Sequence, residues 1–274
     1  MTTYHGIYSE NNALKRWYNS VMVAGSAVIA NSAYTAELIR QRYPESQATL
    51  HIVHRGTDMA LFDPLQVSQT EKTALRTRWR FPDNRPIVML VARLTDWKGH
   101  LLAVKAAEIL KRAGGVCPFF VFAGRAQSET YAARLRSAIF EAGLIEDVVL
   151  IGHADNVPLC LSLADLVIVP STKPEAFGRS VAEASAMERP VIAFDHGGAV
   201  ETIACPPAFG VEAQTGLRVA VGDVTALADA IKKIVNLPES ERTAMGKRGR
   251  AHILRHFSTD QMIAKTLSVY KTLL

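Results

Sequence analysis

The sequence predicts an α/β protein built around a doubly wound parallel sheet, with a second, smaller α/β unit ahead of it. From residue 87 onward, short apolar runs alternate with longer segments whose composition favours helices. The runs are almost continuously apolar, which is typical of parallel strands that helices cover on both faces. With 274 residues, of which 49% are hydrophobic, the chain is long enough to bury such a core.

The first part of the chain predicts the smaller unit, in which short strands and helices alternate. The expected strands are 2–6, 27–30 and 50–53, and the expected helices are 12–24 and 35–43. Residues 54–64 are expected to form a loop, and a connecting region begins at Pro64.

The larger unit is expected to contain six strands with helices between them. The strands are predicted at 87–91, 119–123, 148–151, 166–169, 191–194 and 217–219. The helices are predicted at 99–112, 127–142, 157–163, 177–187, 200–204 and 224–235. The tail from residue 238 predicts two helices that break near Phe257, with Ser258 or Thr259 as the N-cap of the last one.

The stretch 166–187 carries two carboxylates that one elongated ligand could reach. It is predicted as a buried strand, a loop and a helix, with Glu175 in the loop and Glu183 two turns into the helix. Eight positions span roughly 12 Å of helix. Glu183 lies among Val and Ala residues, so we expect it to be partly enclosed and to need a polar partner, such as ligand hydroxyls. Taken alone, both residues also fit ordinary surface positions.

The net charge of +5 favours an anionic partner, which can be nucleic acid, a membrane surface or a phosphorylated small molecule. Charge alone does not choose among them. The three cysteines are far apart and lack C-x-x-C spacing, which argues against a disulfide framework and predicts a reducing, cytoplasmic location. The longest apolar run near the start is too short to span a bilayer.

Ligands of such sheets bind beyond the carboxyl ends of the strands, so the residues that follow each predicted strand are the candidate ligand-binding residues. Arg93 ends the first strand of the larger unit, and Lys98 lies at the start of the next helix. Two cations and a helix N-terminus in one place predict an anion site, for which a diphosphate is the natural occupant. The alternative is that both residues are solvated surface charges.

Three further strand ends supply weaker candidates. Gly124 would allow the backbone to approach a ligand closely, and Arg125 adds a cation. The polar loop with Asn156 could hydrogen-bond a nucleobase, and Gly198 permits unusual backbone angles near a ligand. Gly124 and Gly152 are equally well explained as turn residues.

Several catalytic motifs do not occur. Without a G-x-G-x-x-G after a strand or a G-x-x-x-x-G-K-[ST], a dinucleotide oxidoreductase and a P-loop NTPase lose their main support. Nor is there a D-x-D or an H-E-x-x-H, and the eight histidines do not cluster at metal-ligand spacing. We therefore expect neither a metal requirement nor a cofactor.

Together these residues resemble the retaining glycosyltransferases of family 4, which have the GT-B fold. The resemblance rests on ARLTDWKG, on PEAFGRSVAEASAM, in which seven residues separate two glutamates, and on RPVIAFDHGGAVETI. It is extended over nearly the whole chain by IANSAYTAELI, HRGTDMALFDP, TGLRVAVGD and FSTDQMIAKTLSVYKTLL. The glutamate pair in its Pro-Glu-Ala-Phe-Gly context is the specific part of the signal.

The resemblance implies roles for the matching residues. In that family, the Arg and Lys that match Arg93 and Lys98 bind the diphosphate of a sugar nucleotide. The Glu that matches Glu175 contacts the donor hexose, and backbone amides near Phe177 and Gly178 assist it.

Two more residues follow from the same resemblance. The Glu that matches Glu183 holds the ribose hydroxyls, and His5 resembles an active-site His at the end of a strand. A His that only caps a strand end fits His5 about as well. No residue stands out as a covalent nucleophile, so the resemblance implies attack on the same face of the sugar, with a donor phosphate oxygen accepting the acceptor proton.

The resemblance also implies domain boundaries. Residues 1–64 correspond to the end of an N-terminal acceptor domain, 65–256 to a nucleotide-sugar donor domain, and 257–274 to a helix returning toward the N-terminal domain. Most of the acceptor domain, roughly a hundred residues, is expected to be missing. The implied reaction moves a hexosyl group from a UDP-, GDP- or ADP-sugar to a glycan or lipid-linked acceptor. The alternative is a truncated, non-catalytic nucleotide-sugar binding module.

The start of the chain is similar to bacterial lipopolysaccharide core transferases, in YHGIYSENNALKRWYNSVM and IANSAYTAELI. This similarity implies an acceptor from lipopolysaccharide or surface polysaccharide biosynthesis and a peripheral contact of the basic surface with the anionic inner face of a membrane. Nucleic-acid binding, prompted by LKRWY and RTRWRF, is not expected, because these clusters lie on presumed helix faces that are more often solvated.

Overall fold

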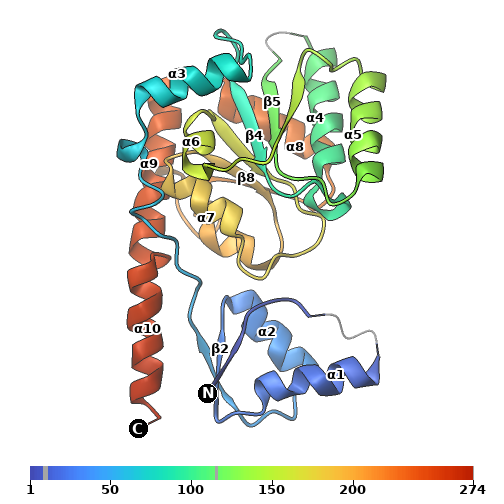
Figure 1. Ribbon diagram of the computed structural model, residues 1–274. Coiled ribbons are helices and arrows are strands. Elements are labelled where there is room, and N and C mark those ends of the chain that lie inside the picture. Colours follow the sequence, from blue (N-terminus) through green and yellow to red (C-terminus); the bar gives the residue numbers. More distant parts are fainter. Residues whose placement is uncertain (9–11, 115–116, 274) are drawn as a thin grey trace.

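The computed structural model describes residues 1–8, 12–114 and 117–273, and it contains two parallel sheets in two units (Figure 1). The smaller sheet has the strand order β1-β2-β3 and the larger has the order β6-β5-β4-β7-β8-β9. Strands pair in parallel in both sheets. The predicted α/β class and doubly wound parallel sheet are therefore confirmed.

The bounds of the elements are as follows. The strands are β1 (Thr2–Tyr4), β2 (Ala27–Ala30), β3 (Thr49–Ile52), β4 (Ile87–Val91), β5 (Phe119–Ala123), β6 (Val148–Gly152), β7 (Leu166–Val169), β8 (Val191–Phe194) and β9 (Gly216–Val219). The α-helices are α1 (Ala13–Ser20), α2 (Ala33–Arg42), α3 (Gln69–Arg78), α4 (His100–Arg112), α5 (Glu129–Glu141), α6 (Val157–Ser162), α7 (Arg179–Ala186), α8 (Val224–Val235), α9 (Glu239–His256) and α10 (Thr259–Lys271).

The main errors of the sequence-based prediction lie at helix starts. The helix expected at 177–187 begins at Arg179, so Glu183 is one turn into α7 rather than two. The cause is Gly178, whose φ of +88° is left-handed and cannot continue a right-handed helix. Similarly, α2 begins two residues earlier than expected because the side chain of Ser32 caps it.

Two segments adopt a different structure from the one expected. The connecting region after Pro64 contains α3, which a capping box between Ser68 and Glu71 starts. The helix expected at 200–204 is instead part of a 3-10 helix, Gly197–Thr202. The N-cap of the last helix is Ser258, one of the two residues predicted for it.

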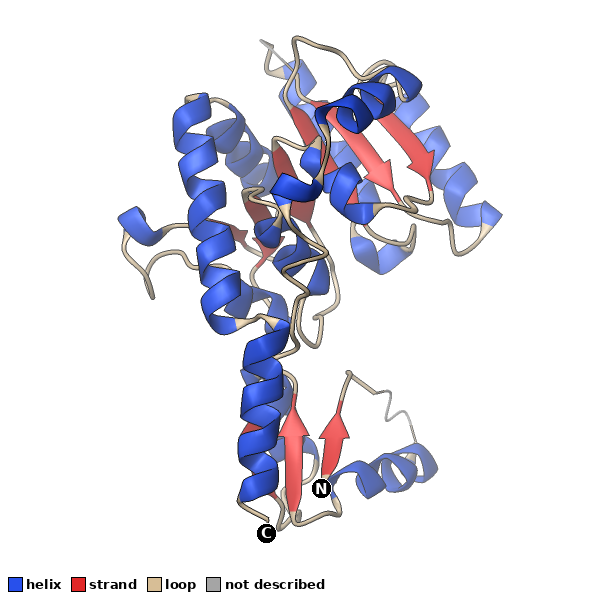
Figure 2. Cartoon of the chain, turned by 60° about the vertical axis from the view of Figure 1, so that its left-hand side comes forward, coloured by secondary structure: helices blue, strands red, loops and turns tan. Residues whose placement is uncertain are grey.

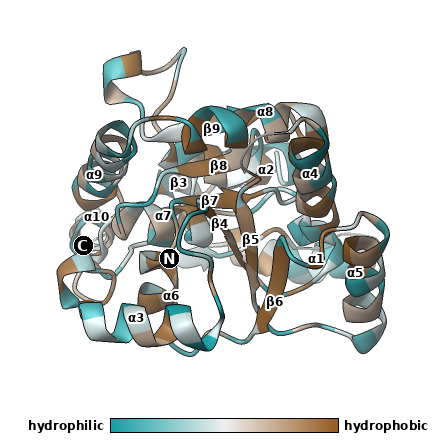
Figure 3. Ribbon diagram, turned by 90° about the horizontal axis from the view of Figure 1, so that it is seen from above, coloured by the Kyte–Doolittle hydropathy of each residue, from teal (hydrophilic) through white to brown (hydrophobic). Residues whose placement is uncertain are grey.

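Helices cover both faces of the larger sheet because its strands alternate their side chains between two cores. In β4, Ile87 and Met89 belong to one hydrophobic cluster, whereas Val88 and Leu90 belong to the other. The second cluster packs against α4, α5 and α8, and the first against α6, α7 and α9. Seen from above, the strands are brown with apolar residues and lie inside a ring of helices whose outer turns are hydrophilic (Figure 3).

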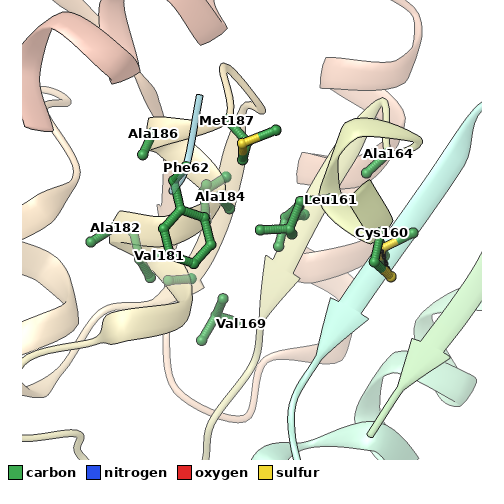
Figure 4. Packing of buried hydrophobic residues seen from close by; sticks show 14 of the residues in the cluster. Phe62, Cys160, Leu161, Ala164, Val169, Val181, Ala182, Ala184, Ala186 and Met187 are labelled. Atoms are coloured by element: carbon green, nitrogen blue, oxygen red, sulfur yellow. Dashed lines mark hydrogen bonds between the residues drawn. The ribbon is translucent and has the colours of Figure 1, made fainter. Parts of the chain in front are cut away.

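Small side chains bring α7 close to the sheet. Val181, Ala182, Ala184 and Ala186 are fully buried. Figure 4 shows the ring of Phe62, which comes from the loop between the units, lying against this helix. The loop is thereby attached to the larger unit beside α7.

The C-terminal helices connect the two units. α9 runs along the larger unit, and α10 continues beside the smaller one (Figures 1 and 2). Val269 of α10 lies in one cluster with Ala27, Ile29 and Val53. Where the chain crosses between the units, Thr57 pairs with Ser258. The domain boundaries given above remain predictions.

In the described part of the chain, no helix combines the length and the apolar character that crossing a bilayer would require.

Candidate functional site

The strand order creates the site. β4 lies at the centre of the larger sheet, with β5 and β6 on one side and β7, β8 and β9 on the other. The order along the chain reverses between β4 and β7, and ligands of open α/β sheets bind beyond the carboxyl ends of the strands at such a switch point. In Figure 2, the strands of the smaller sheet also point their carboxyl ends toward the larger unit. The carboxyl ends of the strands of the two sheets therefore face one another.

A pocket of about 420 Å³ lies at this place. The smaller unit contributes His5, Asn31 and Arg55. The larger unit contributes Ala92, Arg93, Trp97, Lys98, Glu175, Ala176, Phe177, Gly178, Arg179, Ser180 and Glu183. Seven of the residues predicted from the sequence are thus brought together: His5, Arg93, Lys98, Glu175, Phe177, Gly178 and Glu183.

A largely buried ion pair joins the two sides of the switch point. Nζ of Lys98, in the loop after β4, lies 2.7 Å from Oε1 of Glu175, in the loop after β7, and both side chains are almost enclosed, at 12% and 13% exposed. The hydroxyl of Ser171 donates a second hydrogen bond of 2.7 Å to the same oxygen. Neither Lys98 nor Glu175 is a solvated surface charge, so that alternative does not hold for them.

Backbone contacts fix the loops that present this pair. The N–H of Thr172 donates to the carbonyl of Trp97 at 2.7 Å, and the N–H of Gly198 donates to the carbonyl of Glu175 at 2.7 Å. A Cβ on Gly198 would lie 2.4 Å from the carbonyl oxygen of Ala176. Gly198 therefore supports the loop by close backbone packing.

Glu183 has a protein partner in addition to any ligand. Its carboxylate is 16% exposed and lies 2.9 Å from Nη2 of Arg179, one turn earlier in α7. Burial raises the pKa of Glu183 above its usual range, and Arg179 opposes that rise. The sequence predicted that an enclosed Glu183 carboxylate needs a polar partner. The structure supplies such a partner within the chain, since Arg179 forms an ion pair with it.

The remaining predicted residues lie around or outside this pocket. Gly124 and Arg125 line an adjacent, more apolar pocket of about 400 Å³, to which Arg93 also contributes. A Cβ on Gly124 would lie 1.9 Å from the carbonyl oxygen of Ala92, so only glycine fits there. Asn156 lies in neither pocket; its side chain accepts from the N–H of Leu159 and caps α6.

Several lining residues were not predicted from the sequence, among them Asn31, Arg55 and Arg179. Arg179 could have been found from its i, i+4 spacing to Glu183. Asn31 and Arg55 follow strands of the smaller sheet. The rule that ligands bind at carboxyl strand ends would have selected them if it had been applied to both sheets.

Comparison with known proteins assigns the chain to a family. Residues 71–252, well over half of the chain, match the family model described as glycosyl transferases group 1. The chain belongs to this family. The matched range contains Arg93, Lys98, Glu175 and Glu183.

Two relatives of this chain share somewhat less than a third of their residues with it over the matched range. The D-inositol 3-phosphate glycosyltransferase of Xylanimonas cellulosilytica is 28% identical over 253 residues, which cover 91% of this chain and 58% of that protein. The lipopolysaccharide core biosynthesis mannosyltransferase LpcC of Rhizobium leguminosarum bv. viciae is 27% identical over 274 residues, which cover 95% of this chain and 73% of that protein. The chain thus spans less than two thirds of the first relative.

Solved structures agree on the fold. A glycosyltransferase from Rickettsia africae superimposes with a TM-score of 0.88 at 29% identity, over 99% of this chain and 69% of the other. HepE of Anabaena, solved in complex with UDP and glucose, gives a TM-score of 0.79 at 23% identity, over 99% and 71% of the two chains. The GT-B fold implied by the resemblance is confirmed.

In this member of the glycosyltransferase family, Glu201 of the larger unit binds residues of the smaller unit. Its carboxylate accepts from the backbone N–H groups of Ala33 at 2.8 Å and Tyr34 at 2.9 Å, at the start of α2, and lies 2.8 Å from Nε2 of His54. A carboxylate suits a helix N-terminus, where N–H groups lack helical partners. Burial alone would raise the pKa of Glu201, but the hydrogen bonds from His54, Tyr34 and Ala33 outweigh it, so the pKa is lowered.

Replacing Glu201 by Gln is expected to destabilise the protein at neutral pH and to have little effect in acid. Because the pKa of Glu201 is lowered on folding, its contribution is complete above the usual 4.5 and is lost as the pH falls through the lowered value. An amide cannot replace a carboxylate that receives three donors, so we expect a loss of about 1–3 kcal/mol in the free energy of unfolding, measured by urea denaturation.

The matched control for this prediction is Glu45→Gln, which neutralises an exposed carboxylate of the smaller unit. It should leave the unfolding curve nearly unchanged at both pH values. A loss for Glu201→Gln that is equally large in acid would show that the carboxylate charge does not carry the contact.

Proposed function

We propose that this chain provides the donor site of a retaining glycosyltransferase, which moves a hexosyl group from a nucleoside diphosphate sugar to a glycan or lipid-linked acceptor hydroxyl. The observation that carries the proposal is the largely buried pair of Lys98 and Glu175 at the switch point, which shares with Arg93 a pocket between the carboxyl ends of the two sheets. The family match over residues 71–252 supports it.

Charge stabilisation is the proposed source of catalysis. The acceptor oxygen forms a bond to the anomeric carbon, the bond from that carbon to the diphosphate oxygen breaks, and the acceptor proton moves to a phosphate oxygen of the leaving group. The leaving diphosphate gains negative charge, which Arg93, Lys98 and the N-terminal amides of α7 would stabilise. In this proposal these groups do what a metal ion does in other enzymes, and neither a metal nor a cofactor takes part.

The other lining residues are proposed to position the donor. Glu175 would orient the hexose hydroxyls, with backbone amides at Phe177 and Gly178 beside it. Glu183, one turn into α7, would hold the ribose hydroxyls together with Arg179. His5, directly after β1, lines the pocket from the smaller unit and would face the acceptor.

We also propose an acceptor from lipopolysaccharide or surface polysaccharide biosynthesis and a peripheral contact with an anionic membrane. One supporting relative is the core mannosyltransferase LpcC. A second support is α1 and the residue after it, where Leu14, Trp17, Tyr18 and Val21 are each more than 60% exposed next to Lys15 and Arg16. Sedimentation with vesicles that contain anionic lipid tests the contact, which fails if neutral and anionic vesicles bind equally.

A donor screen tests the proposed function. UDP-, GDP- and ADP-sugars are added to the protein and its thermal unfolding is followed. A true donor at a hundred times its Kd stabilises by about 2.7 kcal/mol, which raises the unfolding temperature by several degrees. Transfer is then measured with the selected donor, with and without a chelator. Donor binding without transfer to any acceptor would favour the binding-module alternative, and the absence of binding to all three would refute the proposal.

A further inference from the structure

Two arginines in the pocket have no counter-charge among the residues that the structure describes. The charged residues of the lining are Arg55, Arg93, Lys98, Arg179, Glu175 and Glu183. Lys98 is paired with Glu175, and Arg179 is paired with Glu183. Across residues 1–8, 12–114 and 117–273, no ion pair or side-chain hydrogen bond is found for Arg55 or Arg93. The pocket thus keeps two positive charges for a ligand.

These two arginines approach from opposite units. Arg93 follows β4 of the larger sheet, whereas Arg55 lies three residues beyond β3 of the smaller sheet. Both line the same pocket of about 420 Å³, together with His5 and Asn31 from the other strand ends of the smaller sheet. A ligand bound by Arg93 therefore lies in a pocket that also contains the guanidinium of Arg55 from the smaller unit.

The backbone on both sides of Arg55 is fixed. The preceding residue, His54, is bound to Glu201. The N–H of Thr57 donates to the carbonyl of Phe257 at 2.7 Å, and a Cβ on Gly56 would lie 2.5 Å from Cα of Thr259. Arg55 is thus an exposed side chain on a fixed backbone segment, so its Cα position relative to the pocket is set while its guanidinium stays accessible to a ligand.

We propose that Arg55 is a third cation for the leaving diphosphate, supplied by the smaller unit across the pocket from Arg93 and Lys98; this assignment rests on the proposed function. A guanidinium binds phosphate oxygens through two parallel N–H bonds, and a diphosphate carries enough charge to balance both free arginines. Because Arg55 and Arg93 belong to different units, the leaving group is fully neutralised only while Glu201 and its partners hold those units together.

Calorimetric titration with inorganic pyrophosphate and with UDP, GDP and ADP tests the assignment on the intact chain. For Arg55→Ala we expect affinity for pyrophosphate, and for the nucleoside diphosphate that wild type prefers, to fall about 10- to 100-fold. Arg55→Lys keeps the charge without the fork and should lose less. Arg78→Ala removes an exposed arginine from α3 that does not line the pocket, and this variant should bind as wild type does.

The outcomes separate this inference from the proposed function. If Arg55→Ala binds both pyrophosphate and the preferred nucleoside diphosphate with wild-type affinity, the assignment is overturned. This holds also when the variant has a raised KM for an acceptor, because Arg55 would then bind an anionic acceptor and not the diphosphate. A wild-type chain that binds none of the four probes overturns the proposed function and the assignment with it. Urea denaturation establishes that the variants are folded, as expected for an exposed side chain.

Discussion

Replacing Lys98 by Ala is expected to lower the rate of sugar transfer roughly 10²- to 10³-fold, the loss that follows when one preorganised donor to a developing anion is removed. Lys98 is 12% exposed, so water cannot readily take the place of its ammonium group. The Trp97 ring, whose centroid lies 4.2 Å from Nζ, further restricts the space around it. The measurement is the steady-state rate of transfer with the donor found by the screen.

Loss of Lys98 also leaves the carboxylate of Glu175 buried with the hydroxyl of Ser171 as its hydrogen-bond partner. A buried charge without a counter-ion destabilises a protein, so Lys98→Ala is expected to lower the free energy of unfolding as well. The double variant Lys98→Ala, Glu175→Gln removes both charges and should regain stability without regaining transfer. That result would separate catalysis from folding.

The control for charge removal is Lys105→Ala, an exposed lysine of α4 that lies outside the pocket. It should transfer sugar at the wild-type rate. A folded Lys98→Ala variant with wild-type transfer would rule out the assigned role of Lys98 and, with it, the placement of the diphosphate at this end of the pocket.

Replacing Gly99 by Ala is expected to lower the free energy of unfolding by about 3 kcal/mol or more, from backbone strain and from a clash together. Gly99 has a φ of +79°, and a Cβ there would lie 1.9 Å from the carbonyl oxygen of Pro170. Gly99 follows Lys98, and Pro170 follows β7. The clash therefore pushes apart the two loops that bring Lys98 to Glu175, and donor binding should weaken too.

Gly222→Ala is the matched control for this prediction. Gly222 has nearly the same φ, +78°, but nothing lies within 4 Å of its Cβ position. It should lose only the strain of a left-handed residue, about 1–2 kcal/mol, and should bind the donor as wild type does. The measurement is urea denaturation of both variants; equal losses would mean that the loops after β4 and β7 adapt easily to one another.

Strand positions in the larger unit were predictable from the sequence because each strand is buried on both faces. The predicted bounds of β4, β5, β7 and β8 match the structure to the residue. Their continuous apolar character, ended by polar or glycine residues, is a local signal that needs no tertiary information. The predicted anion site was equally local, because Arg93 and Lys98 follow β4 within a few residues.

The start of α7 was not predictable by composition. Ala, Glu and Ser around residue 180 favour a helix, yet Gly178 packs against Ala199 so closely that a Cβ would lie 2.5 Å from the Cα of that residue. This contact joins loops after two different strands. That close approach requires a glycine at position 178, and helix propensity cannot report a contact with a residue of another loop.

The sequence by itself determined which residues end the strands, and hence that two cations and two carboxylates are available for an anionic sugar donor. Only the tertiary structure decided how they combine. The order β5-β4-β7 brings Lys98 and Glu175, 77 residues apart, into an ion pair. The facing sheet adds Arg55 to the same pocket. The physical reason is that periodicity and propensity act within an element, whereas strand order and the approach of two units are fixed by contacts between residues distant in the chain.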